Sequence, residues 1–370
     1  PTMSPRRPQD PASRPPPRLH SVPAVPELHE QRPEVHEALI TALLGAVGDG
    51  GGAAALSLTA TGVVGTAGLG KTTAATCLAH DARVHARFAD GIVWLVFGQE
   101  RDALSNLRKL GRCLGLRREI WNEWTDADEA NDELTPLLKD KRVLIVLDDV
   151  WEYPRQVKPF KDLLMRSRGG GSAQGSKLLL TTRVCKVAEA AGGLTELSQC
   201  NEAVGLRILA KYMGRPSSEL SDDADAKRLV KMSGGLPIML EQWGVACRRQ
   251  SMASLVAELN KAKEGMEVLN VDAAGDYEYG NFFAGLEAQL ARLEKSEKEE
   301  EREMARCYCM LAVSREDDQV PIDEARRLWA AGVERMKGET SATRVARGLA
   351  GEKLLKLEEG ESGMRLSLLD

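Results

Sequence analysis

The pattern of apolar and polar positions divides the chain near residue 200. Before that point, apolar runs at 56–64, 91–97, 142–150 and 177–183 alternate with stretches whose apolar residues recur at helical spacing. A last short run follows at 194–199. Because successive positions of these runs are apolar, helices are expected to cover both of their faces. The pattern therefore predicts an α/β domain built on a parallel sheet.

The stretches between these runs predict the helices of that domain. Five segments carry the helical pattern, and the last of them restarts after Pro154: 35–47, 71–88, 101–116, 128–140 and 151–167. The glycine-rich segment 169–176 is expected to be a loop in solvent.

Beyond residue 200 the alternation stops and helical patterns dominate. Three segments predict a small helical domain: 201–214, 223–235 and 235–250. Pro237 suits the first turn of the third helix. Farther on, the charged segment 294–303 indicates a solvated helix face, 320–332 predicts a helix, and 353–370 predicts a helix end followed by a β-hairpin.

These changes predict four parts of the chain. They are a disordered proline-rich tail (1–18), an α/β domain (19–200), a helical domain (201–270) and a C-terminal domain (271–370).

Composition narrows the class of protein. A hydrophobic content of 43% is ordinary for a globular chain, and the net charge of −5 argues against tight electrostatic binding of nucleic acid. Seven cysteines without a C-x-x-C pair favour a reducing, cytoplasmic setting, with Cys307 and Cys309 as small core residues. The uncharged stretch 50–70 is rich in Gly, Ala, Thr and Ser, so no membrane segment is expected.

The most informative motif is GTAGLGKTT at 65–73, which fits G-x-x-x-x-G-K-[ST]. It lies between a predicted strand and a predicted helix, as a phosphate-binding loop requires. Its loop residues Gly65, Gly68, Leu69 and Gly70 would surround the phosphates with backbone N–H groups. Three side chains follow with expected roles: Lys71 reaches the β- and γ-phosphates, the Thr72 hydroxyl ligates Mg²⁺, and Thr73 contacts the α-phosphate.

A second motif, LIVLDDVW at 144–151, is an apolar strand that ends in two acids. This arrangement holds a magnesium ion beside a phosphate loop. Together the motifs predict a P-loop NTPase sheet that binds ATP or ADP with Mg²⁺.

Further strings in the same order resemble the NB-ARC family. This family is the nucleotide-switch module of plant disease-resistance proteins, of the apoptotic protease-activating factor and of related signal-transduction ATPases. The resemblance covers 22–370 and rests on VPAVPELHEQRPEV (22–35), the two motifs above, KLLLTTR (177–183), GGLPIML (234–240) and VPIDEARRLWAAG (320–332).

The resemblance implies a P-loop nucleotide-binding domain at 19–200, a winged-helix-like domain at 271–370, and roles for matching residues. Asp148 would hold Mg²⁺, and Asp149 would orient or activate the attacking water. Arg183 would sense a γ-phosphate, Pro237 would pack on the adenine face, and Arg32 would follow the peptide that lines the adenine pocket. Glu30 and Gln31 stand where the family has small or aliphatic residues before this arginine.

Several of these residues have an ordinary structural alternative. Asp149 could end its strand, Arg183 could be a strand-terminal charge, and Pro237 could begin a helix. Trp151 is expected to serve packing rather than chemistry. The family's Met-His-Asp motif is also altered, because Ser367 and Leu368 stand in place of its histidine and aspartate.

The resulting hypothesis is an ADP/ATP switch in signalling or defence. ADP would hold a closed state, ATP an open one, and slow Mg²⁺-dependent hydrolysis would reset it. Protein partners or self-oligomerisation are expected on activation. The alternatives are a continuously cycling motor ATPase, a nucleotide-binding scaffold without hydrolysis, and a DNA-binding regulator that uses the winged helix.

Overall fold

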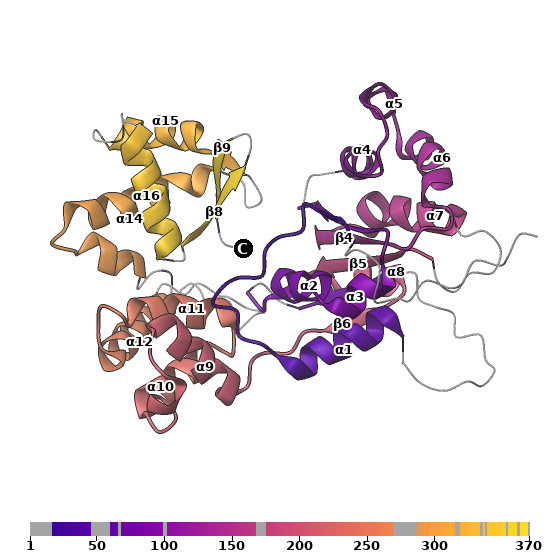
Figure 1. Cartoon of the computed structure of the whole chain (residues 1–370). Coiled ribbons are helices and arrows are strands. Elements are labelled where there is room, and N and C mark those ends of the chain that lie inside the picture. Colours follow the sequence, from indigo (N-terminus) through magenta and orange to yellow (C-terminus); the bar gives the residue numbers. More distant parts are fainter. Residues whose placement is uncertain are drawn as a thin grey trace, which may run out of the picture. The chain divides into compact units, whose positions relative to one another are not determined.

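The computed structural model describes residues 17–45, 60–65, 68–98, 102–167, 175–268, 286, 289–314, 319–333, 336, 339–352, 354–360 and 363–368. Two compact units divide the chain (Figure 1): one contains Pro1–Glu27 and Gln31–Ser198, and the other contains Leu28–Glu30 and Gln199–Asp370. The finer division into a tail and three domains stays a prediction, and residues 1–16 of that tail lie outside the described ranges.

The first unit is built on a six-stranded sheet in which every pairing is parallel, in the order β1-β3-β4-β5-β2-β6. Its strands are β1 (Leu19–His20), β2 (Ala60–Val64), β3 (Gly91–Val96), β4 (Val143–Val150), β5 (Lys177–Thr182) and β6 (Leu194–Glu196). The predicted parallel sheet is therefore confirmed. Strand β5 lies between β2, which leads into the phosphate loop, and β4, which ends in the two acids.

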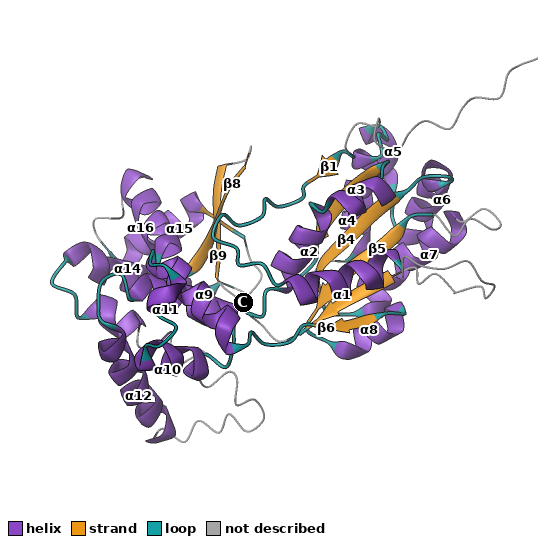
Figure 2. Cartoon of the chain, turned by 60° about the horizontal axis from the view of Figure 1, so that its bottom comes forward, coloured by secondary structure: helices purple, strands orange, loops and turns teal. Residues whose placement is uncertain are grey.

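Helices cover both faces of this sheet (Figure 2). One face is covered by α1 (Pro33–Leu44), α2 (Lys71–Ala79) and α3 (Ala82–Arg87). The other face is covered by α4 (Ala103–Cys113), α6 (Ala127–Leu138), α7 (Lys158–Ser167) and α8 (Cys185–Ala191), and α5 (Arg118–Glu123) packs against α4. One π-helical turn, Tyr153–Val157, precedes α7.

The core on the α4–α8 face follows the two-residue period of the strands. Alternate strand residues enter it, among them Val93, Leu95, Ile145 and Leu147. Because the strands carry apolar residues at the intervening positions as well, the opposite face is also buried against α1–α3. A sheet covered on both sides places functional groups at the carboxyl ends of its strands.

Several predicted helices differ in their limits. The helix expected over 71–88 is two helices, because the Asp81 backbone is extended and its carboxylate caps α3 by accepting from the Arg83 N–H at 2.7 Å. The helix expected to restart after Pro154 begins with the π-helical turn at Tyr153, which contains this proline, and continues as α7 from Lys158. Helices α5 and α8 were not predicted.

The second unit begins with helices, as predicted. They are α9 (Glu202–Met213), α10 (Ala224–Met232), α11 (Pro237–Ala246) and α12 (Met252–Val268), with a 3-10 turn at Ser217–Glu219. The helix α11 begins at Pro237, and α9 packs against both α10 and α11.

The rest of the second unit has a winged-helix arrangement. Its elements follow one another in this order: helix α14 (Glu299–Met310) with a 3-10 turn (Leu311–Val313), strand β7 (Val320–Pro321), helices α15 (Ile322–Gly332) and α16 (Glu339–Gly351), and strands β8 (Leu355–Gly360) and β9 (Gly363–Leu368). The antiparallel sheet has the order β7-β9-β8. The predicted hairpin is confirmed, but the helix before it, α16, already ends at Gly351.

Two expectations about α14 were wrong in part. Cys307 is buried and Cys309 is exposed, so only the first is a core residue. Glu303 is buried, unlike a solvated charge. Within the described ranges, the helices are all too short or too polar to cross a bilayer.

Candidate nucleotide site

The turn between β2 and α2 has the backbone that a phosphate loop needs. Gly68 and Gly70 have φ values of 77° and 86°, in the left-handed region that side chains disfavour. Gly70 is also the N-cap of α2. Residues 66 and 67 lie outside the described ranges. The turn places the amino end of α2 beyond strand β2, where helix N–H groups attract anions.

The first turn of α2 carries the three predicted phosphate and metal ligands. Lys71 is only 9% exposed, which is unusual for a lysine. Thr72 donates from its Oγ1 to Asp148 Oδ1 at 3.0 Å, joining the loop to the end of β4. Thr73 is half-buried in the same turn. Thr72 therefore joins this turn to the acidic end of β4, and the phosphate and metal roles of the three residues stay predictions.

Thr181 of β5 fixes the two acids relative to each other. Its Oγ1 donates to Asp148 Oδ1 at 2.6 Å and accepts from the Asp149 N–H at 2.9 Å. Asp148 is 6% exposed, so its carboxylate is held by two hydroxyl groups away from bulk water. The pairing of β4 with β5 shifts register between Leu147 and Val150, at the position of the two acids. No role for Thr181 was predicted from the sequence.

Asp149 has an uncommon backbone conformation. Its φ is 56°, in the left-handed region that few non-glycine residues occupy. Its Oδ2 accepts from Trp151 Nε1 at 3.2 Å, and the guanidinium of Arg183 lies over the Trp151 ring at 5.1 Å from the ring centre. Asp149, Trp151 and Arg183 thus form one contact chain at the carboxyl ends of β4 and β5.

Gln156 holds the segment after β4. Its Oε1 accepts from the N–H groups of Trp151 at 2.7 Å and Glu152 at 3.0 Å, and its Nε2 donates to the Gly98 carbonyl at 2.7 Å. Gln156 is 1% exposed, so these bonds are shielded from water. No sequence motif indicated this residue, because a glutamine early in a helix is ordinary.

Arg32 lies beside the phosphate loop. It is the N-cap residue of α1, and its Nη1 donates to the Leu69 carbonyl at 3.4 Å. Its Nη2 donates to the carbonyl of Ser198. The structure therefore brings Arg32 and Leu69 together, as expected of residues in one site.

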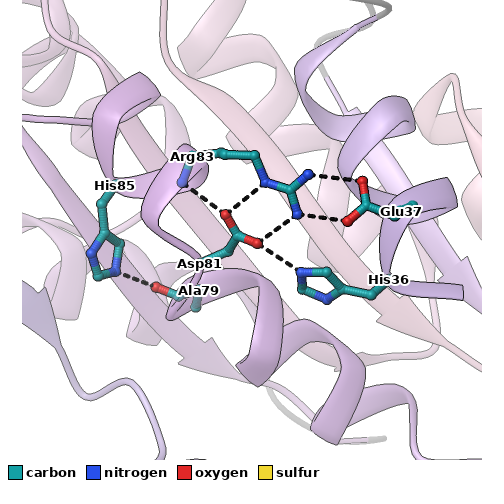
Figure 3. A network of polar contacts seen from close by, with 6 residues as sticks. All are labelled: His36, Glu37, Ala79, Asp81, Arg83 and His85. Atoms are coloured by element: carbon teal, nitrogen blue, oxygen red, sulfur yellow. Dashed lines mark hydrogen bonds and ion pairs between the residues drawn. The ribbon is translucent and has the colours of Figure 1, made fainter. Parts of the chain in front are cut away.

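A polar network holds α1 against α2 and α3 (Figure 3). Arg83 donates from Nη1 and Nη2 to the two carboxylate oxygens of Glu37 at 2.8 and 2.9 Å, and from Nε and Nη2 to Asp81 at 3.0 and 2.8 Å. His36 Nε2 lies 2.8 Å from Asp81 Oδ2. The hydrogen bonds from Arg83 lower the pKa of Asp81 below its ordinary value. Burial opposes this shift, and the hydrogen bond with His36 adds to it.

Glu30, Pro237 and Ser367 belong to the second unit. Glu30 accepts from Arg207 Nε of α9 at 2.6 Å, which explains a charged residue before Arg32 where a small one was expected. Pro237 is the first residue of α11, and its expected contact with adenine stays a prediction. Ser367 lies in strand β9, opposite Lys356.

The donor set between α2 and β4 fits a magnesium ion. Thr72 Oγ1 and Asp148 Oδ1 are hard oxygen donors 3.0 Å apart. Mg²⁺ typically takes one or two carboxylates and completes its shell with phosphate oxygens and water. Across the described ranges, no cluster of three or more His, Cys, Asp or Glu side chains could hold a metal on its own. A metal here would therefore complete its shell with phosphate oxygens and water.

Comparison with known proteins finds one family model and several plant relatives that match part of this chain. The family model of the NB-ARC domain matches residues 54–211. The disease resistance protein RGA2 of Solanum bulbocastanum is 32% identical over 187 residues, which cover 49% of this chain and 18% of the relative. A probable disease resistance protein of Arabidopsis thaliana is 25% identical over 263 residues, covering 71% of this chain and 28% of that relative.

Structure comparison matches this chain to two archaeal proteins. Cdc6p of Pyrobaculum aerophilum has a TM-score of 0.45 and 13% identity, with 94% of this chain and 92% of that chain covered. A signal-transduction ATPase with numerous domains from Pyrococcus horikoshii, which carries a tetratricopeptide repeat sensor, has a TM-score of 0.43 and 14% identity, with 90% and 53% covered.

The match to the family spans most of the site. Residues 54–211 contain the phosphate loop, both acids of β4, Thr181 and Arg183, whereas Arg32 and Pro237 lie outside them. This chain spans less than a third of the length of the two plant relatives, 18% and 28%. With the motifs, the geometry and these relatives in agreement, residues 54–211 of this chain form an NB-ARC domain.

Proposed function

We propose that this chain is the ADP/ATP switch of a signalling protein, with slow Mg²⁺-dependent ATP hydrolysis as its reset. The observation that carries this proposal is the hydrogen bond from Thr72 of the phosphate loop to Asp148 of β4, whose carboxylate also accepts from Thr181. It joins a phosphate-binding turn to an acidic strand end with oxygen donors that suit Mg²⁺. A flexible glycine-rich turn with a solvated lysine would not need this contact.

Each residue of the loop has a role in nucleotide binding. The N–H groups of Gly65, Gly68, Leu69 and Gly70 surround the phosphates, and Lys71 neutralises the β- and γ-phosphates. Thr73 contacts the α-phosphate. At the base, Arg32 holds the adenine-side segment to the Leu69 carbonyl, and Pro237 packs on the ring.

Thr72 and Asp148 would hold Mg²⁺, which would supply positive charge beside the phosphates. Asp149 orients a water molecule toward the γ-phosphorus and accepts its proton. The new phosphorus–oxygen bond forms as the bond to the bridging oxygen breaks, and ADP and phosphate are released. Arg183 contacts the γ-phosphate and distinguishes ATP from ADP.

The switch follows from a difference in affinity between two states. ADP stabilises the closed arrangement and ATP the open one. Each nucleotide shifts the equilibrium by the difference between its affinities for the two states. The disease-resistance function named for the relatives supports a role in defence, with self-association or a protein partner in the ATP state. Hydrolysis returns the protein to the ADP state and is slow, because a signal needs long-lived states.

The proposal is tested by removing the carboxylate of Asp149. We expect Asp149→Ala and Asp149→Asn to slow single-turnover ATP hydrolysis by roughly 10²–10⁴, the contribution typical of general acid–base groups, with nucleotide affinity retained. Asparagine tolerates the left-handed backbone, so this variant isolates the charge.

A matched control is available at Asp140. It is exposed and also has a left-handed φ, 60°, so Asp140→Ala carries the same backbone cost without touching the site. If the Asp149 variants cleave ATP at the wild-type rate, the catalytic role is wrong. If the wild type itself binds ATP without cleaving it, the chain is a nucleotide-binding scaffold.

A further inference from the structure

Trp151 contacts two residues that have different roles in the proposed reaction. Its indole N–H donates to Asp149 Oδ2 at 3.2 Å, and the guanidinium of Arg183 lies over its ring at 5.1 Å. Asp149 is the group assigned to water, and Arg183 is the group assigned to the γ-phosphate. One half-buried side chain thus contacts both of them.

Tryptophan suits this position for two chemical reasons. Its indole carries one N–H donor, which matches a carboxylate acceptor. Its face is also the best aromatic surface for a cation. Phenylalanine would keep a face and lose the donor, and leucine would lose both. These differences allow the two contacts of Trp151 to be separated by mutation.

The backbone around Trp151 is also fixed. Buried Gln156 accepts from the N–H groups of Trp151 and Glu152 and donates to the Gly98 carbonyl. The N–H of Gly98 in turn donates to the Asp149 carbonyl at 2.9 Å. The indole therefore extends from a rigid segment, which is what a positioning residue requires.

Packing does not account for this tryptophan. Among the described residues that build the core of the first unit, Val150 and Val157 lie on either side of it in sequence, but Trp151 is not one of them. The indole is directed at a carboxylate and a guanidinium instead. The contacts of Trp151 therefore do not favour the packing role that was expected from the sequence.

We propose that Trp151 is a positioning residue that couples Asp149 to Arg183. Its N–H sets the orientation of the Asp149 carboxylate, and its ring sets the place of the Arg183 guanidinium. This inference rests on the proposed function, because it assigns Trp151 to the same hydrolysis step and the same γ-phosphate contact.

The test compares Trp151→Phe and Trp151→Leu with the wild type. We expect Trp151→Phe to slow single-turnover hydrolysis by roughly tenfold, because a hydrogen bond to a charged group is lost, with ADP and ATP affinities unchanged. Trp151→Leu should slow hydrolysis equally and also weaken ATP by about two- to fivefold, with ADP unaffected, because the cation–π contact is lost.

A double variant distinguishes positioning from general damage. If Trp151 acts through Asp149, Asp149→Asn combined with Trp151→Phe should be no slower than Asp149→Asn alone. Trp121 is a half-buried tryptophan of α5, and Trp121→Phe is therefore the matched control. It should leave every rate and affinity unchanged. Wild-type hydrolysis by Trp151→Phe, or equal weakening of ADP and ATP by Trp151→Leu, would overturn the proposal.

A spectroscopic measurement tests the coupling without hydrolysis. In the nucleotide-free protein, the ¹H–¹⁵N resonance of the Trp151 indole should shift in Asp149→Asn and in Arg183→Ala, and stay in place in Asp140→Ala. A resonance that moves in neither site variant contradicts the coupling. If the wild type cleaves no ATP but both shifts occur, the proposed hydrolysis fails while the contact chain stands.

Discussion

The hydroxyl of Thr181 offers a direct measure of how the two acids of β4 are held. Valine has nearly the same shape, so Thr181→Val removes two hydrogen bonds with little change in volume. The bond to the charged Asp148 is worth about 1.5–3 kcal/mol and the bond from the Asp149 N–H about 1 kcal/mol. Because Thr181 is 1% exposed, water cannot replace either bond. We expect the variant to lose about 3 kcal/mol of stability in the sheet.

Native-state hydrogen exchange of the β4 and β5 amides measures this loss in the first unit alone. A loss of about 3 kcal/mol should make their exchange through global opening roughly 100-fold faster. Thr181→Ser is the control, because it keeps both bonds and loses only a buried methyl group, at about 1 kcal/mol. Equal exchange rates in the valine and serine variants would refute the reasoning.

Two further predictions concern Asp81 and Thr72. Because its contacts lower the pKa of Asp81, its stabilising effect is complete above its ordinary pKa near 4 and is lost as the pH falls. Asp81→Asn, which keeps the cap of α3, should cost about 1 kcal/mol at pH 7 and progressively less as the pH falls below 4; a cost as large at pH 2 as at pH 7 in urea titrations would contradict this. Thr72→Val should remove the Mg²⁺ dependence of nucleotide affinity and weaken nucleotide binding in Mg²⁺ by roughly tenfold; because it also removes the hydrogen bond to Asp148, stability should fall by about 1 kcal/mol. Calorimetry with and without EDTA tests it, and a preserved Mg²⁺ effect would exclude Thr72 as a ligand.

The sequence predicted the strands well, because a strand buried on both faces must be an apolar run. It predicted short helices poorly: α5 and α8 have six and seven residues, and helices of this length depend on tertiary packing more than on their own sequence. The break before α3 depended on one capping aspartate inside a continuous helical pattern.

The site divides in the same way. Lys71, Thr72 and Asp148 lie in motifs that are local in sequence, and the structure brings them together as expected. The roles of Thr181 and Gln156 depend on contacts across 32 or more residues, Thr181 to Asp149 and Gln156 to Gly98. Such contacts exist only because β4 lies between β3 and β5, and apolar runs alone do not specify that strand order.

The central claim is that an adenine nucleotide binds at the loop that carries Lys71. The most direct test is the nucleotide released from the purified chain, identified by chromatography and mass spectrometry, beside calorimetric titration of ADP and ATP with Mg²⁺. The account predicts bound ADP or ATP in the wild type, and at least tenfold weaker binding in Lys71→Ala and Lys71→Met with an unchanged circular dichroism spectrum. A wild type that neither carries nor binds adenine nucleotide, or a folded Lys71 variant with wild-type affinity, would contradict it.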